Sequence, residues 1–151
     1  FAVLTKGRKP GEFIARFDLD PYERSRLYVS THILAHELSE TAIRDALRRG
    51  HAFVAHDWLC DSTGFAFVAR KGGSNVIMGD EVGSGKGLVL RAATPVKCSM
   101  KLFRDGKVVQ IKDSNRLDFE VTTPGVYRLE AWLEIDGELR PWIYSNAIYV
   151  R

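Results

Sequence analysis

A chain of 151 residues is long enough for one ordinary domain, or for a small domain with an appendage. With 45% hydrophobic and 27% charged residues it can build a packed core, which argues against a disordered protein. The net charge of +3 is scattered rather than clustered, and no apolar run approaches the ~20 residues that cross a bilayer. We therefore expect neither a nucleic-acid partner nor a membrane partner.

The first 50 residues form a segment of mixed composition that leans toward helix. Phe1–Phe17 shows little periodicity, so we expect a loop or an isolated strand there. Pro21 suits the first position of a short helix over Asp20–Arg26. Because the chain opens with Phe1 rather than Met, we expect an excised domain or a processed product.

The clearest helix is predicted from Glu40 to Arg49. Ser39 can cap its first turn, where Glu40 also suits the helix dipole. Gly50 follows as a left-handed terminator. This placement explains the cluster of Arg44, Arg48 and Arg49 without any ligand. The apolar face is assigned to Ala42, Ile43, Ala46 and Leu47.

From residue 51 onward the sequence alternates like β-structure, with turn signals at short intervals. Asp105-Gly106 and Asp136-Gly137 are typical of two-residue hairpin turns, and Pro141 indicates an edge position or a bulge in the last strand. Roughly seven or more short strands at this spacing favour a β-sandwich. The predicted strands are His51–His56, Gly64–Arg70, Asn75–Met78, Gly87–Ala93, Val96–Arg104, Lys107–Ile111, Arg116–Val121, Val126–Ile135 and Glu138–Val150.

Tyr127 stands where immunoglobulin-like sandwiches keep a "tyrosine corner", a Tyr near the start of a strand whose hydroxyl bonds back to the preceding connection. Disulfide-bearing members have a Cys two residues later, and this chain has Leu129 there. We therefore predict a mainly β fold. Its core is an immunoglobulin-like antiparallel β-sandwich over residues 51–151, preceded by a short helical segment within residues 1–50.

The last hairpin allows a register to be predicted. If its turn is centred on Asp136-Gly137, Trp142 lies opposite Ala131 and Tyr144 lies opposite Leu129. Trp132 then points outward, either as a tolerated surface aromatic or as a contact to another domain or ligand. The core face of the first strand is assigned to Leu129, Ala131, Leu133 and Ile135.

The glycine-rich stretch Gly83–Gly87 resembles a phosphate-binding loop but lacks two residues that the motif requires. Asp80 stands where the motif needs its first Gly, and Gly87 stands where it needs a hydroxyl. The segment that follows is predicted to be a strand rather than a helix, so we interpret the stretch as a turn.

Four histidines are the candidate metal ligands. His32 and His36 would share a face if their segment were helical, but zinc needs a third ligand and Glu37 lies off that face. His51 and His56, near Asp57 and Asp61, would face opposite sides of a strand. We interpret all four as structural, and Asp80-Glu81 as solvated turn residues.

No nucleophile stands out from the sequence. There is no Gly-x-Ser-x-Gly elbow, and neither Cys60 nor Cys98 has a readable His partner. Two cysteines are too few for a disulfide scaffold, and whether they pair cannot be read from their spacing. We therefore assign no catalytic, cofactor-binding or metal-binding residue.

Six short stretches carry a family resemblance through their order along the chain. They are Thr31–Leu34, Ala46–Ala55, Gly64–Phe67, Met78–Glu81, Gly125–Glu130 and Pro141–Val150. Together they resemble the C-terminal region of metallohydrolases in the polymerase-and-histidinol-phosphatase (PHP) superfamily, especially its carbaryl-hydrolase-like branch. The likeness runs from about residue 20 onward, with Ala147 where that family has Pro.

The resemblance implies that a metal-binding, barrel-like catalytic domain precedes this region. Such domains hold divalent metals through His-x-His and Asp-x-His motifs, neither of which occurs in this chain. The resemblance thus implies that residues 1–50 are the C-terminal tail of the catalytic domain and that residues 51–151 are a β-sandwich appended to it. The expected partner of this chain is the catalytic domain of the same protein. The expected function is a non-catalytic module of a PHP-type hydrolase. The alternatives are a free-standing carbohydrate- or protein-binding module and, third, a small metalloenzyme using the four histidines.

Overall fold

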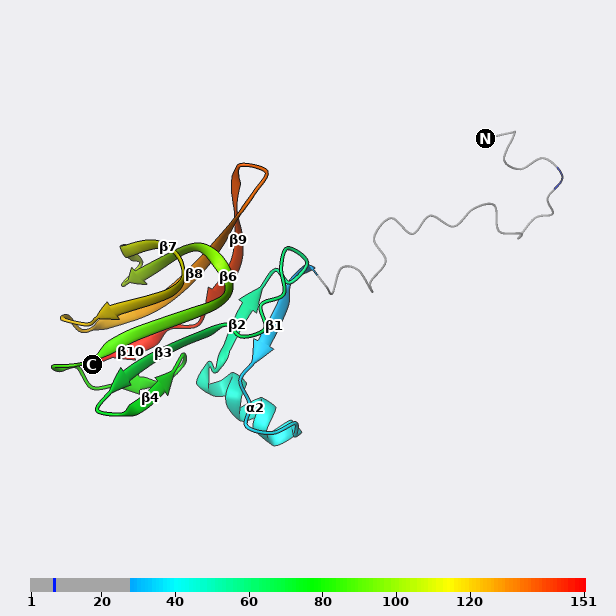
Figure 1. The fold of residues 1–151 in the computed structure, drawn as a ribbon. Helices are drawn as coiled ribbons and strands as arrows, with labels where there is room; N and C mark the ends of the chain where they lie inside the picture. The colour runs from blue at the N-terminus through cyan, green and yellow to red at the C-terminus, as the bar shows by residue number, and fades with distance from the viewer. Residues whose placement is uncertain (1–6, 8–27) are drawn as a thin grey trace.

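The computed structural model describes Gly7 and residues 28–151 (Figure 1). The predictions for Phe1–Phe17, apart from the turn at Gly7, and for Asp20–Arg26 lie outside these residues. No helix in the described part is long and apolar enough to cross a membrane. The described elements are β1 (Ser30–Ile33), α2 (Glu40–Arg49), β2 (Ala52–Ala55), β3 (Ala66–Lys71), β4 (Ser74–Ile77), β5 (Glu81–Val82), β6 (Val89–Arg104), β7 (Lys107–Glu120), β8 (Gly125–Ile135), β9 (Glu138–Ser145) and β10 (Ile148–Val150).

The strands form one curled, hydrogen-bonded network of ten strands, in which the main path runs β1-β2-β9-β8-β6-β3-β4. All pairings are antiparallel except the parallel pair of β5 with β10. The prediction of a mainly β, antiparallel fold with a short helix is confirmed. β1 precedes the helix and pairs with β2 at one edge, so residues 30–33 are hydrogen-bonded into the same sheet as the strands that follow the helix (Figure 1).

The two longest strands, β6 and β7, form the curved part of the sheet. The first part of β6 pairs with β3 and its last part pairs with β8, while β7 follows β6 along the opposite side. The register with β7 shifts between Ala93 and Cys98. Pro95 has no N–H to donate, and it is tolerated because it lies in this unpaired stretch. The strands predicted on either side of residues 94–95 are therefore one strand, as are the two predicted across residues 112–115.

The helix α2 has the predicted bounds and caps. Ser39 Oγ accepts a hydrogen bond from the Ala42 N–H, and Gly50 ends the helix with φ +75°. Ala42 and Ala46 are buried against the sheet, as predicted. Leu47 was wrongly assigned to the buried face, because α2 contacts the sheet through its alanines and leaves Leu47 50% exposed.

Both predicted hairpin turns are present. Asp105 and Gly106 have φ of 49° and 80°, and Asp136 and Gly137 have φ of 53° and 78°. Positive φ at both central residues is the geometry that matches the right-handed twist of paired strands. These turns join β6 to β7 and β8 to β9.

The predicted register of the last hairpin is correct from the turn to Trp132, and the two predicted pairs beyond it are wrong. Ile143, not Trp142, lies opposite Ala131, and Tyr144 lies opposite Glu130. The cause is a bulge, which shifts the register between Ala131 and Trp132 and leaves Trp142 as the extra residue after Pro141. Pro141 thus marks a bulge, as predicted.

The core lies inside the curl of the sheet. Leu129 and Ala131 are buried there as predicted, whereas Leu133 is only partly buried against it. Tyr127 is fully buried, and its hydroxyl donates to the Thr123 carbonyl at 2.6 Å. That bond is the predicted tyrosine corner. The largest fully buried side chains are Trp142, Tyr127, Phe67, Met78, Leu88, Leu90, Met100, Leu102, Leu117, Leu129, Ile143 and Ile148.

Candidate functional site

The first polar cluster joins β1 to the loop after β2. His32 Nε2 lies 2.6 Å from Asp57 Oδ2 and 3.3 Å from the hydroxyl of Ser62. Ser62 Oγ donates to the other oxygen of Asp57 at 2.6 Å. The His32 ring also stacks on Phe53, with the ring centroids 4.6 Å apart and the planes 3° from parallel.

This cluster has the residue types of a Ser-His-Asp triad but not its geometry. In a triad one ring nitrogen faces the Ser and the other faces the Asp. Here the same nitrogen of His32 faces both, and the Ser62 hydroxyl donates to Asp57. Ser62 is also completely buried, so no substrate carbonyl can reach it. The arrangement ties a loop to the edge of the sheet.

The charge state of Asp57 fits this structural role. Burial raises the pKa of Asp57, but the hydrogen bonds from Ser62 and His32, together with the charge of His32, outweigh burial and bring the pKa below its usual value. Asp57 is therefore a carboxylate at neutral pH and an acceptor for both neighbours.

A second His–carboxylate pair lies where α2 ends. His51 Nε2 is 2.7 Å from Asp80 Oδ1, and the His51 side chain is only 12% exposed. Asp80 belongs to the turn between β4 and β5, which packs directly against the helix end. A Cβ on Gly79 would lie 2.3 Å from the carbonyl oxygen of Arg49, so only Gly fits there.

The two residues between β9 and β10, Asn146 and Ala147, also bond to the end of α2 and to the turn at Gly79. The Asn146 side-chain amide donates to the Gly50 carbonyl at 2.8 Å. The Gly79 N–H donates to the Ala147 carbonyl at 2.6 Å. We call Gly50, His51, Gly79, Asp80 and Asn146 the helix-end junction. These residues belong to three of the stretches that carry the PHP resemblance, and their polar groups bond to one another.

The other two histidines lie apart from these clusters. His36 lies in the loop after β1 rather than on a helix with His32, and its side chain is 81% exposed. His56 follows β2, and its ring lies 6.3 Å from that of Tyr144. Among residues 28–151 no three His, Cys, Asp or Glu side chains are placed to hold one metal ion.

Both cysteines are free thiols. Burial raises the pKa of Cys98, and burial together with the charges of Asp61 and Asp57 raises the pKa of Cys60. Thiolate formation is therefore disfavoured at both, which is unfavourable for a nucleophile.

The glycine-rich loop presents carbonyl oxygens where a phosphate site needs N–H groups. Lys71 Nζ donates to the carbonyls of Gly83 and Ser84, at 2.9 and 2.8 Å. The N–H of Ser84 is bonded to the carbonyl of Arg151. The loop is a turn between strands, as interpreted from the sequence.

Trp132 lies on the outward face of the sheet, as predicted. Its indole N–H donates to Glu130 at 3.0 Å, and the ammonium of Lys101 lies 4.0 Å from the ring centroid. Arg128 pairs with Glu130 and also covers the ring of Phe103. Although Glu130 is on the outward face, these neighbours leave it only 8% exposed. The face is thus an ordered layer of aromatic and charged side chains.

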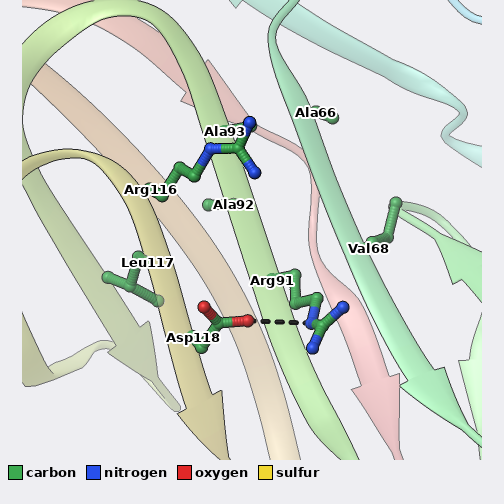
Figure 2. Close-up of a pocket in the computed structure, with 8 residues that line it drawn as sticks. All are labelled: Ala66, Val68, Arg91, Ala92, Ala93, Arg116, Leu117 and Asp118. Carbon is green, nitrogen blue, oxygen red and sulfur yellow. Dashed lines mark ion pairs between the residues drawn. The ribbon is translucent and has the colours of Figure 1, made fainter.

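A shallow groove of about 310 Å³ crosses β3, β6 and β7. Figure 2 shows the Arg116 side chain extending toward Ala93, and Arg91 pairs with Asp118 at 2.8 Å. The three charged groups sum to one positive charge, which suits one anionic group. Both members of the Arg91–Asp118 pair are about half exposed, so water weakens any attraction here.

Comparison with known proteins gives no assignment: no family model, curated protein or solved structure matches the chain. Sequence reasoning missed Ser62, Glu130 and the groove, because each depends on pairings between segments far apart in the chain. The acid–imidazole proximity of Asp57 to the histidines was the one visible signal.

Proposed function

We propose that this chain is a non-catalytic, immunoglobulin-like C-terminal module of a PHP-type metal-dependent hydrolase, and that it packs on or shapes the catalytic domain of the same polypeptide. The observation that carries the proposal is the helix-end junction. Stretches that resemble the PHP C-terminal region converge there, and their side-chain and backbone polar groups bond to one another. A framework role for these motifs is consistent with a module that supports another domain.

The polar clusters support the same proposal. Asp57 and Asp80 each bind a His from a neighbouring element, and so connect parts of this chain. In the proposal the divalent metals and the hydrolysis belong to the catalytic domain, and no cofactor is assigned to this module.

Metal retention tests the proposal. The 151-residue chain is loaded with Mn²⁺ or Zn²⁺, dialysed, and analysed by elemental mass spectrometry and for hydrolysis of p-nitrophenyl phosphate. We expect neither stoichiometric metal nor hydrolysis, and the coding sequence upstream of Phe1 should encode His-x-His and Asp-x-His motifs. Retention of one metal per chain, or an upstream sequence without those motifs, would contradict the proposal.

The layer around Trp132 favours one alternative, a free-standing carbohydrate- or protein-binding module. Trp and Arg are the residue types that dominate binding surfaces. Because Lys101 already covers the Trp132 ring, a sugar could stack only on what the ammonium leaves open. Glycan-array binding that is lost in Trp132→Ala but kept in Trp58→Ala would establish this alternative over the first proposal.

A further inference from the structure

Nine outward-facing side chains form a regular grid on β3, β6 and β7. Successive residues of a strand point to opposite faces of the sheet, so every second residue faces outward. The residues between them, such as Phe67, Leu90 and Leu117, are buried in the core. The strand pairing places the outward residues in three rows: Ala66, Ala93 and Arg116; Val68, Arg91 and Asp118; and Arg70, Val89 and Glu120.

Three arginines cross this grid on a diagonal, one from each strand: Arg70, Arg91 and Arg116. Diagonal neighbours on adjacent strands lie about 7–8 Å apart, which is within reach of long side chains. Arg91 Nε lies 2.8 Å from Asp118 Oδ1. Arg70 and Arg116 form no ion pair with any residue between 28 and 151. An anion placed between two guanidinium groups of this diagonal is attracted by both.

The two sides of the diagonal differ in chemistry. The acidic side chains lie on the β7 side, whereas the other corner holds the short apolar side chains of Ala66, Val68 and Ala93. Because alanine side chains are short, the surface is hollowed there into the groove of about 310 Å³. Arg116 extends toward Ala93, so its guanidinium group borders this hollow (Figure 2).

We infer that the groove binds a small organic oxyanion, which is a carboxylate or a phosphate monoester carried on a flat apolar group. Arg91 and Arg116 contact the oxyanion, because the planar guanidinium fork matches carboxylate and phosphate oxygens. The apolar group lies over Ala66 and Ala93. The groove volume is at the lower end of the range for small-molecule sites.

The inference goes beyond the proposed function and does not depend on it, because no residue of the helix-end junction lines the groove. Two features of the groove limit its affinity. Asp118 borders it with a negative charge, and the side chains of Arg91 and Asp118 are about half exposed to water. We therefore expect weak, saturable binding that becomes weaker as salt is added.

NMR titration of the 151-residue chain with benzoate and with phenyl phosphate tests the inference. The backbone amide signals of Ala66 and Ala93 and the side-chain Nε–H signal of Arg116 should shift and saturate. Comparison of the two probes shows whether the groove prefers a carboxylate or a phosphate. Acetate and inorganic phosphate lack the apolar group and should bind more weakly than the corresponding aromatic probe.

Two variants and a matched control locate the binding. Arg116→Gln should weaken binding by about fivefold, which is the upper range for an exposed ion pair. Ala93→Leu fills the groove without changing the charge and should weaken binding at least as much. Arg70→Gln removes the same charge from the same face but from a residue that does not line the groove, so binding should fall by less than about twofold.

Urea unfolding verifies that each variant is folded before its titration is interpreted. The absence of a saturable shift with either aromatic probe would overturn the inference. Equal losses in Arg70→Gln and Arg116→Gln would also overturn it, because they would show a general attraction of anions to this face. Unchanged affinity in a folded Ala93→Leu variant would show that the ligand does not enter the groove, with the same consequence.

Discussion

Replacing Gly79 by Ala tests whether the helix-end junction holds α2 on the sheet. Gly79 has φ +98°, where a residue with a side chain costs about 1–3 kcal/mol. The new Cβ would also lie 2.3 Å from the Arg49 carbonyl oxygen and 2.7 Å from the Gly50 carbonyl carbon. Both neighbours are backbone atoms, so the helix end must move, at roughly 1–3 kcal/mol for overpacking. We expect a total loss of about 2–6 kcal/mol in the free energy of unfolding.

Gly73→Ala is the matched control for this variant. Gly73 has φ +88°, but no atom lies within 4 Å of the position its Cβ would take. It should therefore show only the backbone strain, about 1–3 kcal/mol. Urea unfolding followed by circular dichroism measures both variants, provided that their m-values agree. If Gly79→Ala costs no more than Gly73→Ala, the close packing of the junction does not stabilise the fold and the reasoning is refuted.

Three further predictions concern the tyrosine corner, the unpaired edge of β7 and the stability of the fold at low pH. Tyr127→Phe removes the hydrogen bond to the Thr123 carbonyl and should lower the free energy of unfolding in urea by about 1–2 kcal/mol. An unchanged free energy of unfolding would show that this bond does not stabilise the fold. β7 pairs only with β6 among the described strands, and its Lys112 is an exposed charge on this free edge, where a Lys opposes pairing with another chain. The Lys112→Leu variant should therefore form dimers or larger species in sedimentation velocity. A variant that stays monomeric at all concentrations would contradict this prediction. Because the folded pKa of Asp57 is lowered, its contribution to stability is present above its unfolded pKa of about 3.9 and is lost as the pH falls through the folded value. Asp57→Asn should flatten unfolding stability against pH below about 4, and an unchanged acid transition would contradict the assignment.

Predictions based on local chemistry agreed with the structure. The helix ends at Ser39 and Gly50 follow from side-chain capping and from the left-handed conformation that Gly adopts freely. The two Asp-Gly turns follow from the positive φ that a two-residue hairpin demands. Each of these needs only a few neighbouring residues, so the sequence contains the whole cause.

Predictions that depend on how distant segments pair with one another agreed with the structure only in part. The bulge at Trp142 was signalled by Pro141, but its exact position moved the pairings beyond it, at Ala131 and Glu130, by one residue. The strand β1 was not anticipated, because it exists only as a partner of β2. The break after Ser145 likewise depends on the distant helix end, to which Asn146 bonds.

The sequence by itself determined the mainly β class, the capped helix, the hairpin turns and the tyrosine corner, since backbone conformation and nearest-neighbour bonding decide these features. The tertiary structure alone decided that His32 meets Asp57 and Ser62, that His51 meets Asp80, and that Leu38 stays uncovered. Those contacts join residues up to 30 positions apart, and their geometry depends on how the sheet curls. The residue types offered four histidines as candidate metal ligands, and the structure pairs two of them, His32 and His51, with Asp57 and Asp80.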